Sequence, residues 1–111
     1  MSFILNTDKM NTEEKKARRY LDDIGLKEGR SGYTYLLEII LFQLFNPSPI
    51  LKSAIWHVSD KYGVSYRNVQ NSIQYALKDL RQAGCELECK QIVIGCINYI
   101  RTTGDSNYEE V

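Results

Sequence analysis

The sequence predicts an all-α protein, a compact domain of about five to six helices that contains a helix-turn-helix motif. Apolar residues recur at helical spacing in successive segments, and glycines stand between these segments. The length of 111 residues, with 43% hydrophobic and 25% charged residues, is typical of one globular domain. These observations exclude a disordered or fibrous protein.

The residue pattern in the first quarter of the chain predicts an N-terminal arm without regular structure, followed by one amphipathic helix. Residues 1–10 show no apolar periodicity, so we expect them to form a flexible N-terminal arm. A helical domain then spans residues 11–101, with Asn11 as the N-cap of a helix that stops at Gly25. The apolar face of this helix has helical spacing and consists of Ala17, Tyr20, Leu21 and Ile24.

A second helix is predicted from Tyr33 to Phe45, with Ser31 as its N-cap. Ten of these thirteen residues are apolar, which predicts burial on most sides, and the segment is long for a strand. A connector follows at residues 46–49, where Ser48 is a candidate N-cap and Pro49 suits the first position of the next helix. We therefore expect a buried central helix.

The helix-turn-helix motif is predicted within residues 50–84. Its first helix ends at Gly63, and its apolar face consists of Leu51, Ile55, Val58 and Tyr62. Ser65 is the expected N-cap of a second helix that ends at Gly84. The apolar face of this second helix consists of Val69, Ile73, Ala76, Leu77 and Leu80. Two helices joined by a short turn centred on glycine are the arrangement of this motif.

The segment after Gly84 has two interpretations. Its apolar residues between Cys85 and Ile100 can pack as a helix or as a short hairpin around Gly95, and we favour the helix. Residues 102–111 are mostly polar, and we expect them to form a C-terminal tail.

The charges are unevenly distributed although they cancel. Fourteen basic and fourteen acidic residues give a formal net charge of zero, which removes any argument from bulk charge to a polyanionic partner. Residues 50–84, however, contain five basic residues and two acidic ones, and no carboxylate lies between Lys61 and Lys78. A surface that contacts DNA phosphates needs such a segment. Lys52 and Lys61 are therefore candidate phosphate contacts.

The polar face of the second helix carries side-chain types that read DNA bases. It consists of Arg67, Gln70, Asn71, Gln74 and Lys78. Arginine bonds guanine bidentately, and asparagine or glutamine bonds adenine in the same way. Ser65 and Tyr66 can donate to phosphate from the start of the helix. A solvated helix face is the alternative, but the glycine turn before it favours double-stranded DNA as the partner.

Catalysis, metals and cofactors have little support in the sequence. The single histidine, His57, has no patterned acid or nucleophile beside it, so we do not expect an enzyme. Cys85, Cys89 and Cys96 lack the pairing of a zinc site and are expected to be small apolar core residues. We therefore predict neither a metal nor a cofactor. The chain has no signal peptide and no apolar stretch of about 20 residues, so we expect a cytoplasmic protein without a membrane partner.

Several stretches together resemble a known family. They are Ile24-Gly25, Gly32-Tyr33-Thr34-Tyr35-Leu36-Leu37-Glu38, Val58-Ser59-Asp60-Lys61-Tyr62, Val69, Ser72-Ile73-Gln74-Tyr75-Ala76-Leu77 and Gly84. Over residues 18–111 the chain resembles the C-terminal DNA-binding domain of the sporulation initiation response regulator of Firmicutes. The Gly-Tyr-x-Tyr-Leu stretch is the most specific part. The resemblance implies an all-helical domain that binds DNA through the second helix of the motif and pairs head-to-tail on adjacent sites.

The resemblance also implies which residues face DNA. Position by position, they are Ser65, Arg67, Asn68, Asn71, Gln74 and Tyr75. Several of these positions usually hold arginine or histidine in the family and are uncharged here, so we expect a weaker affinity for phosphate. The sequence contains no phosphoacceptor receiver domain, so the likeness is to a stand-alone effector domain.

These observations lead to one main hypothesis and one alternative. The main hypothesis is a cytoplasmic, sequence-specific transcriptional regulator that binds adjacent DNA sites as a homodimer. The alternative is a protein-interaction module that binds or antagonises another regulator without reading DNA. It is motivated by the neutral net charge and by the uncharged residues at the family's arginine positions.

Overall fold

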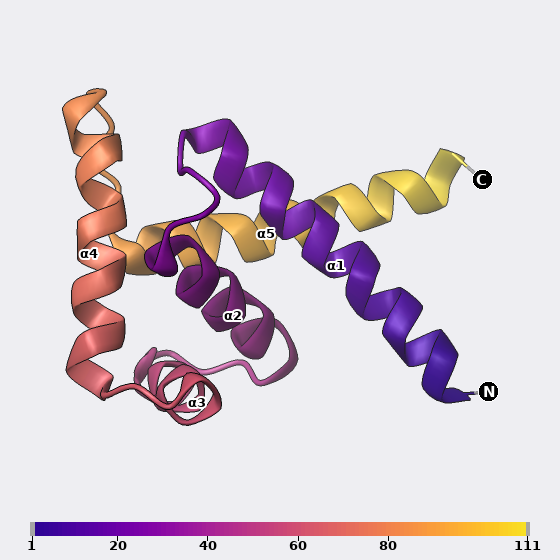
Figure 1. Ribbon diagram of the computed structural model, residues 1–111. Coiled ribbons are helices and arrows are strands. Elements are labelled where there is room, and N and C mark those ends of the chain that lie inside the picture. The colour runs from indigo at the N-terminus through magenta and orange to yellow at the C-terminus, as the bar shows by residue number, and fades with distance from the viewer. Residues whose placement is uncertain (1, 111) are drawn as a thin grey trace.

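The computed structural model describes the backbone of residues 2–110 and the side chains of residues 12–102. This part of the chain forms five helices joined by loops, with no strand, which confirms the all-α fold class. The helices are α1 (Ser2–Ile24), α2 (Ser31–Phe45), α3 (Lys52–Tyr62), α4 (Tyr66–Gln82) and α5 (Cys89–Glu110) (Figure 1).

Helix α2 forms the centre of the molecule, as its apolar sequence predicts. Nine of its 15 residues are buried, and it packs against each of the other four helices. Figure 1 shows these helices arranged around it. Because the apolar surface of α2 points in most directions, it can be removed from water only by neighbours on several sides.

Helix α2 crosses α4 at Gly32, at a separation that leaves no room for a side chain. A Cβ atom on Gly32 would overlap the backbone oxygen of Ser72 and would lie 2.7 Å from the Cβ of Ala76. The two backbones meet directly because the residues at the crossing are small. An ion pair between Arg30 Nε and Asp79 Oδ2, 3.1 Å apart, joins the loop before α2 to α4 at the same junction.

Helices α1 and α5 pack against each other and against α2, and both chain ends point away from α3 and α4 (Figure 1). The rings of Tyr20 and Tyr99 lie 5.7 Å apart between centroids. The hydroxyl of Tyr33 donates a hydrogen bond of 3.0 Å to Asp22, which ties α2 to α1. This part of the core therefore holds α1, α2 and α5 together and leaves α3 and α4 at the opposite end of the molecule.

Both chain ends differ from the sequence-based expectation. Helix α1 begins at Ser2, so the backbone of the expected arm is helical and Asn11 is not an N-cap. Residues 2–10 contain neither glycine nor proline, so nothing in them interrupts backbone hydrogen bonding toward the N-terminus. At the other end, α5 continues through the expected polar tail to Glu110.

The N-caps expected for α2 and α3 are also displaced. The N-cap of α2 is Arg30, and Ser31 is the first helical residue. The N-cap of α3 is Leu51 rather than Ser48. Neither Arg30 nor Leu51 forms a side-chain capping hydrogen bond. A side-chain capping bond therefore does not set where either helix begins.

Hydrogen bonds in the connector explain why α3 begins late. The side-chain amide of Gln43 donates to the backbone oxygen of Ser48 at 2.9 Å. The hydroxyl of Ser48 accepts from the backbone N–H of Ile50 at 3.4 Å. These bonds hold the connector as a loop, so the backbone becomes helical only at Lys52.

The favoured interpretation of the segment after Gly84 is confirmed, and the hairpin alternative is wrong. Helix α5 begins at Cys89 and includes Gly95 in its interior, where Gly95 lies against the hydroxyl of Tyr20. Within residues 89–102 of this helix, the buried residues recur at helical spacing and comprise Ile92, Val93, Cys96 and Ile100.

Replacing Gly32 with alanine is expected to lower the free energy of unfolding by about 1–3 kcal/mol, because the added methyl group must push α2 and α4 apart. Alanine is the better helix former, so any loss of stability comes from the crossing. Urea unfolding followed by circular dichroism measures the change.

Gly95→Ala is the matched control for this substitution. There the added methyl group meets only the end of the Tyr20 side chain, which can rotate away, so a smaller loss is expected. A Gly32→Ala protein as stable as the parent would contradict the close crossing.

Candidate nucleic-acid interface

A three-residue turn, Gly63 to Ser65, joins α3 to α4. Gly63 adopts the left-handed conformation, with φ of 66°, which favours glycine because it has no Cβ. The hydroxyl of Ser59 donates to the backbone oxygen of Val64 at 2.5 Å and closes the turn from the α3 side. The hydroxyl of Ser65 accepts from the backbone N–H of Asn68 at 3.0 Å, which confirms Ser65 as the N-cap of α4. The turn is therefore fixed by its own hydrogen bonds.

Helix α4 lies at the edge of the molecule (Figure 1). The five residues of its predicted apolar face are all buried: Val69, Ile73, Ala76, Leu77 and Leu80. The five residues of the predicted polar face are all exposed: Arg67, Gln70, Asn71, Gln74 and Lys78. The structure thus brings the predicted base-reading side chains together on one exposed face.

One flank of this face lies beside the loop before α2. The ring of Tyr75 is 61% exposed, and two cations lie near it: Arg30, with its guanidinium carbon 5.3 Å from the ring centroid, and Lys78, with its ammonium 5.6 Å away. Asn68 accepts a hydrogen bond of 3.3 Å from the hydroxyl of Ser72 on the same flank. Arg30, which also pairs with Asp79, and Lys78 therefore border an exposed aromatic ring, and Lys78 is suited to a phosphate beside a base or sugar.

The opposite flank borders an open groove of about 500 Å³. Gln70, Asn71 and Gln74 line one wall, and the start of α3 and the start of α5 form the others. Arg81 donates to the side-chain oxygen of Gln74 at 3.3 Å across this flank. These amides therefore face both solvent and groove, which the sequence pattern alone does not predict.

The two lysines predicted to contact phosphate differ in their surroundings. Lys61 forms an ion pair with Glu38 of α2, and the hydroxyl of Tyr62 donates to the same carboxylate at 3.2 Å. The hydrogen bond to Glu38 raises the pKa of Lys61 above its ordinary value. Lys52 is exposed and forms no ion pair with any residue from 12 to 102. Of these two lysines, Lys52 is therefore the one without an ion pair among the described side chains.

Two residues at this surface were missed by the sequence analysis. Trp56 of α3 is 52% exposed, and its ring centroid lies 4.9 Å from that of the half-buried Tyr66. Helical spacing predicts the exposure of Trp56, because Trp56 lies one turn after Lys52 on the side opposite Ile55 and Val58. The other residue, Arg30, belongs to a separate loop, and no spacing rule brings it to α4.

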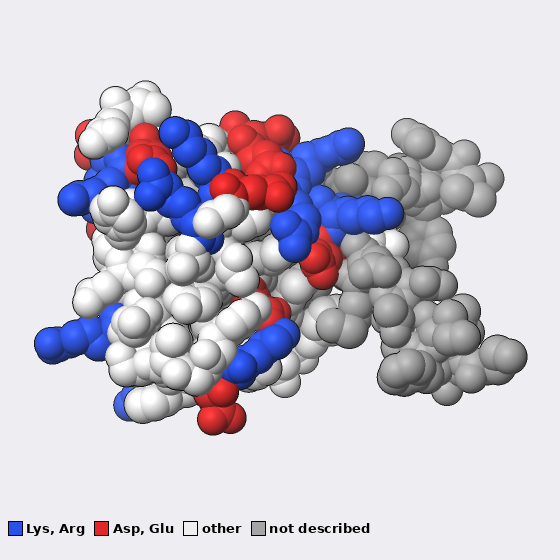
Figure 2. Space-filling model, viewed as in Figure 1, with Lys and Arg blue, Asp and Glu red and all other residues white. Residues whose placement is uncertain are grey.

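Figure 2 shows how charge is distributed on this side of the molecule. Over α3 and the lower end of α4 the surface is largely uncharged, with a few separate charged groups. Above it, over the upper part of α4 and the loop before α2, positive and negative groups lie close together. The start of α4 is therefore surrounded by polar and aromatic side chains rather than by a dense basic patch.

The histidine and two of the cysteines are accounted for by packing and burial. The ring of His57 stacks on Phe42, with centroids 4.6 Å apart. Burial raises the pKa of Cys89 to about 11 and that of Cys96 to about 12, so both thiols stay protonated at neutral pH. Among the side chains of residues 12–102, no group of three histidine, cysteine or carboxylate side chains is placed to hold a metal ion. No helix in the described chain is long and apolar enough to cross a membrane.

Comparisons with known proteins place the chain in no family. No protein-family model, no curated protein sequence and no solved structure matches it. The functional argument therefore depends on the geometry of α3, the turn and α4.

Proposed function

We propose that this protein is a sequence-specific DNA-binding transcriptional regulator, in which α4 enters the major groove and α3 lies across the DNA backbone. The observation that carries the proposal is the exposed polar face of α4, which a tight, internally hydrogen-bonded turn connects to α3. In helix-turn-helix proteins, the N-terminal residues of the second helix contact base edges in this arrangement.

The position of each side chain along α4 assigns it a role. Arg67 and Asn71 lie in the first two turns and one turn apart, so both can reach base edges in one groove. Lys78 lies about 16 Å beyond Arg67 along the helix axis, so it is placed for a phosphate at the groove edge. Ser65 already accepts a hydrogen bond at the cap, which leaves its hydroxyl hydrogen for phosphate.

A single recognition helix offers few base contacts, so we extend the proposal to a homodimer on adjacent DNA sites. The family resemblance implies the same pairing. Two copies double the number of bases read and offset the weak phosphate attraction of a chain with zero net charge. The proposed location is the cytoplasm.

One observation favours the alternative of a protein-interaction module. Trp56 and Tyr62 are 52% and 40% exposed on α3, and the adjacent Lys61 is neutralised by Glu38. An exposed aromatic surface with little charge is typical of a protein contact. The two functions differ in whether the protein enriches a DNA sequence.

Selection of bound duplexes from a random DNA pool at about 150 mM salt tests the proposal, because this salt concentration suppresses purely electrostatic binding. We expect enrichment of one short motif, present as a tandem pair. Retention of DNA only at low salt, with no enriched motif, would overturn the proposal and favour the interaction module.

Replacing Arg67 with alanine is expected to weaken binding to the selected sequence by about 1–3 kcal/mol and to relax base preference at one position. Fluorescence anisotropy on the selected duplex and on single-base variants measures both effects. Arg19→Ala is the matched control, since Arg19 is exposed on α1. Unchanged affinity and preference in Arg67→Ala would remove Arg67 from the reading face.

Phosphate binding is expected to depend on Lys52 and not on Lys61. Lys52→Gln should weaken binding to all DNA sequences by the same factor. It should also flatten the slope of log affinity against log salt concentration by about 1. The paired change Glu38→Gln with Lys61→Gln removes one ion pair at constant net charge and should leave the slope unaltered. A slope lowered equally by both changes would show that Lys61 leaves Glu38 to bind phosphate.

A further inference from the structure

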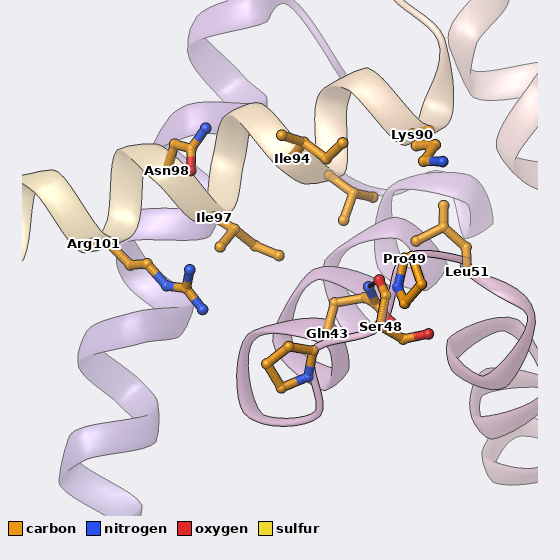
Figure 3. A pocket seen from close by; sticks show the side chains of 11 residues that line it. Gln43, Ser48, Pro49, Leu51, Lys90, Ile94, Ile97, Asn98 and Arg101 are labelled. Atoms are coloured by element: carbon orange, nitrogen blue, oxygen red, sulfur yellow. Dashed lines mark hydrogen bonds between the residues drawn. The ribbon is translucent and has the colours of Figure 1, made fainter.

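The exposed apolar side chains of this protein differ in what they can bind. Ile94 is 50% exposed and lines a pocket of about 210 Å³ between α5 and the connector that precedes α3 (Figure 3). Its side chain offers only hydrocarbon. Trp56 of α3 is 52% exposed, and its indole ring combines a broad apolar face with one N–H group, which can donate a hydrogen bond but cannot accept one. Trp56 therefore suits a partner that offers apolar surface beside a hydrogen-bond acceptor.

Tyr66 holds the ring of Trp56 beside the start of α4. The two ring centroids lie 4.9 Å apart, at an interplanar angle of 52°. Tyr66 is the first helical residue of α4, directly after the N-cap Ser65. A tryptophan side chain has only two rotatable bonds, so ordering it on a partner costs little conformational entropy. The exposed ring is therefore presented at the edge of the turn, next to the residues of α4 that the proposed function places on DNA.

The indole N–H of Trp56 is unused within the described side chains. No side-chain or backbone group from residue 12 to residue 102 accepts a hydrogen bond from it. The two chain ends outside this range point away from α3 (Figure 1). The donor is therefore left to solvent or to a partner.

The charges along the exposed face of α3 indicate from which side a phosphate can approach Trp56. Lys52 and Asp60 are both exposed, and they lie one turn before and one turn after Trp56, each about 6 Å away along the helix axis. Lys52 attracts a phosphate and forms no ion pair with a residue from 12 to 102, whereas Asp60 repels a phosphate. A phosphate contacted by Trp56 therefore lies on the side toward Lys52.

We propose that Trp56 binds the DNA backbone. Its indole N–H donates to a phosphate oxygen, its ring lies against the adjoining sugar, and Lys52 lies beside the same phosphate or its neighbour. This inference rests on the proposed function, because it takes α3 to lie across the DNA backbone. It assigns to DNA the exposed tryptophan that the interaction-module alternative assigns to a protein. A phosphate contact fixes the position of α4 in the groove and carries no base preference of its own.

Trp56→Phe tests the contact, because phenylalanine keeps an aromatic ring against Tyr66 and lacks the N–H. Fluorescence anisotropy is measured on the selected duplex and on an unrelated duplex of the same length. The variant should bind both duplexes about tenfold more weakly than the parent protein, with the ratio of the two affinities unchanged. The slope of log affinity against log salt concentration should also be unchanged, because a neutral donor displaces no counterion. A substitution that merely shifted α3 would move Lys52 as well and would flatten this slope.

Tyr62→Phe is the matched control on the same helix. It also removes one polar hydrogen from an exposed aromatic side chain. Tyr62, however, lies six residues after Trp56, about 120° around the helix, where its hydroxyl donates to Glu38 of α2. The affinity of this variant for both duplexes should equal that of the parent protein. Equal losses in the two variants would overturn the proposal.

Tryptophan fluorescence gives a second measurement, because Trp56 is the only tryptophan of the chain. Saturating duplex should reduce the quenching of its emission by acrylamide. Unchanged quenching, or parental affinity in Trp56→Phe, would overturn the proposal. If Arg67→Ala still relaxed base preference in that case, the proposed function would stand without the Trp56 contact. If the parent protein bound neither duplex, both would be wrong.

Discussion

The structure depends on the close crossing of α2 over α4 at Gly32. Because a methyl group has no space there, the two backbones meet directly, and the ion pair between Arg30 and Asp79 joins the chain beside the crossing. The crossing determines which side of α4 is covered. Once Ile73, Ala76 and Leu77 face α2 and the core, Arg67 and Asn71 must face outward. The proposed reading face is therefore a consequence of how α4 is packed.

Charge compensation gives the surface its particular character. Lys61 is matched by Glu38 and Arg30 by Asp79, so two of the cations around α4 are already paired within the protein. Specificity would then depend on the hydrogen-bonding side chains of α4 and on tandem binding more than on phosphate attraction. Among residues 12–102, Lys52 on α3 and Arg67, Lys78 and Arg81 on α4 form no ion pair, so these four cations stay available to a partner.

The local parts of the fold could be predicted from the sequence. The apolar spacing of Val69 to Leu80, the turn at Gly63 and the N-cap at Ser65 follow from short-range rules, and the structure contains all three. The helix starts at Ser2 and Lys52 were missed. No capping residue or helix breaker near Ser2 marks the start of α1. The start of α3 at Lys52 depends on Gln43 of α2, whose side chain donates a hydrogen bond to the connector. The side chains along α4 were predicted from the sequence. Arg30 and the Lys61–Glu38 pair were not, because they reach this surface through contacts between separate segments of the chain.

The central claim is that the outward face of α4 contacts DNA, and its most direct test is a map of the bound surface. The ¹⁵N-labelled protein is titrated with the duplex that it selects, and backbone amide shifts are followed by NMR. The account predicts the largest changes at Arg67, Asn71 and the turn before them, smaller changes at the start of α3, and none along the part of α1 that packs on α5. Changes confined to α1 and α5, or no change at any duplex concentration, would contradict it.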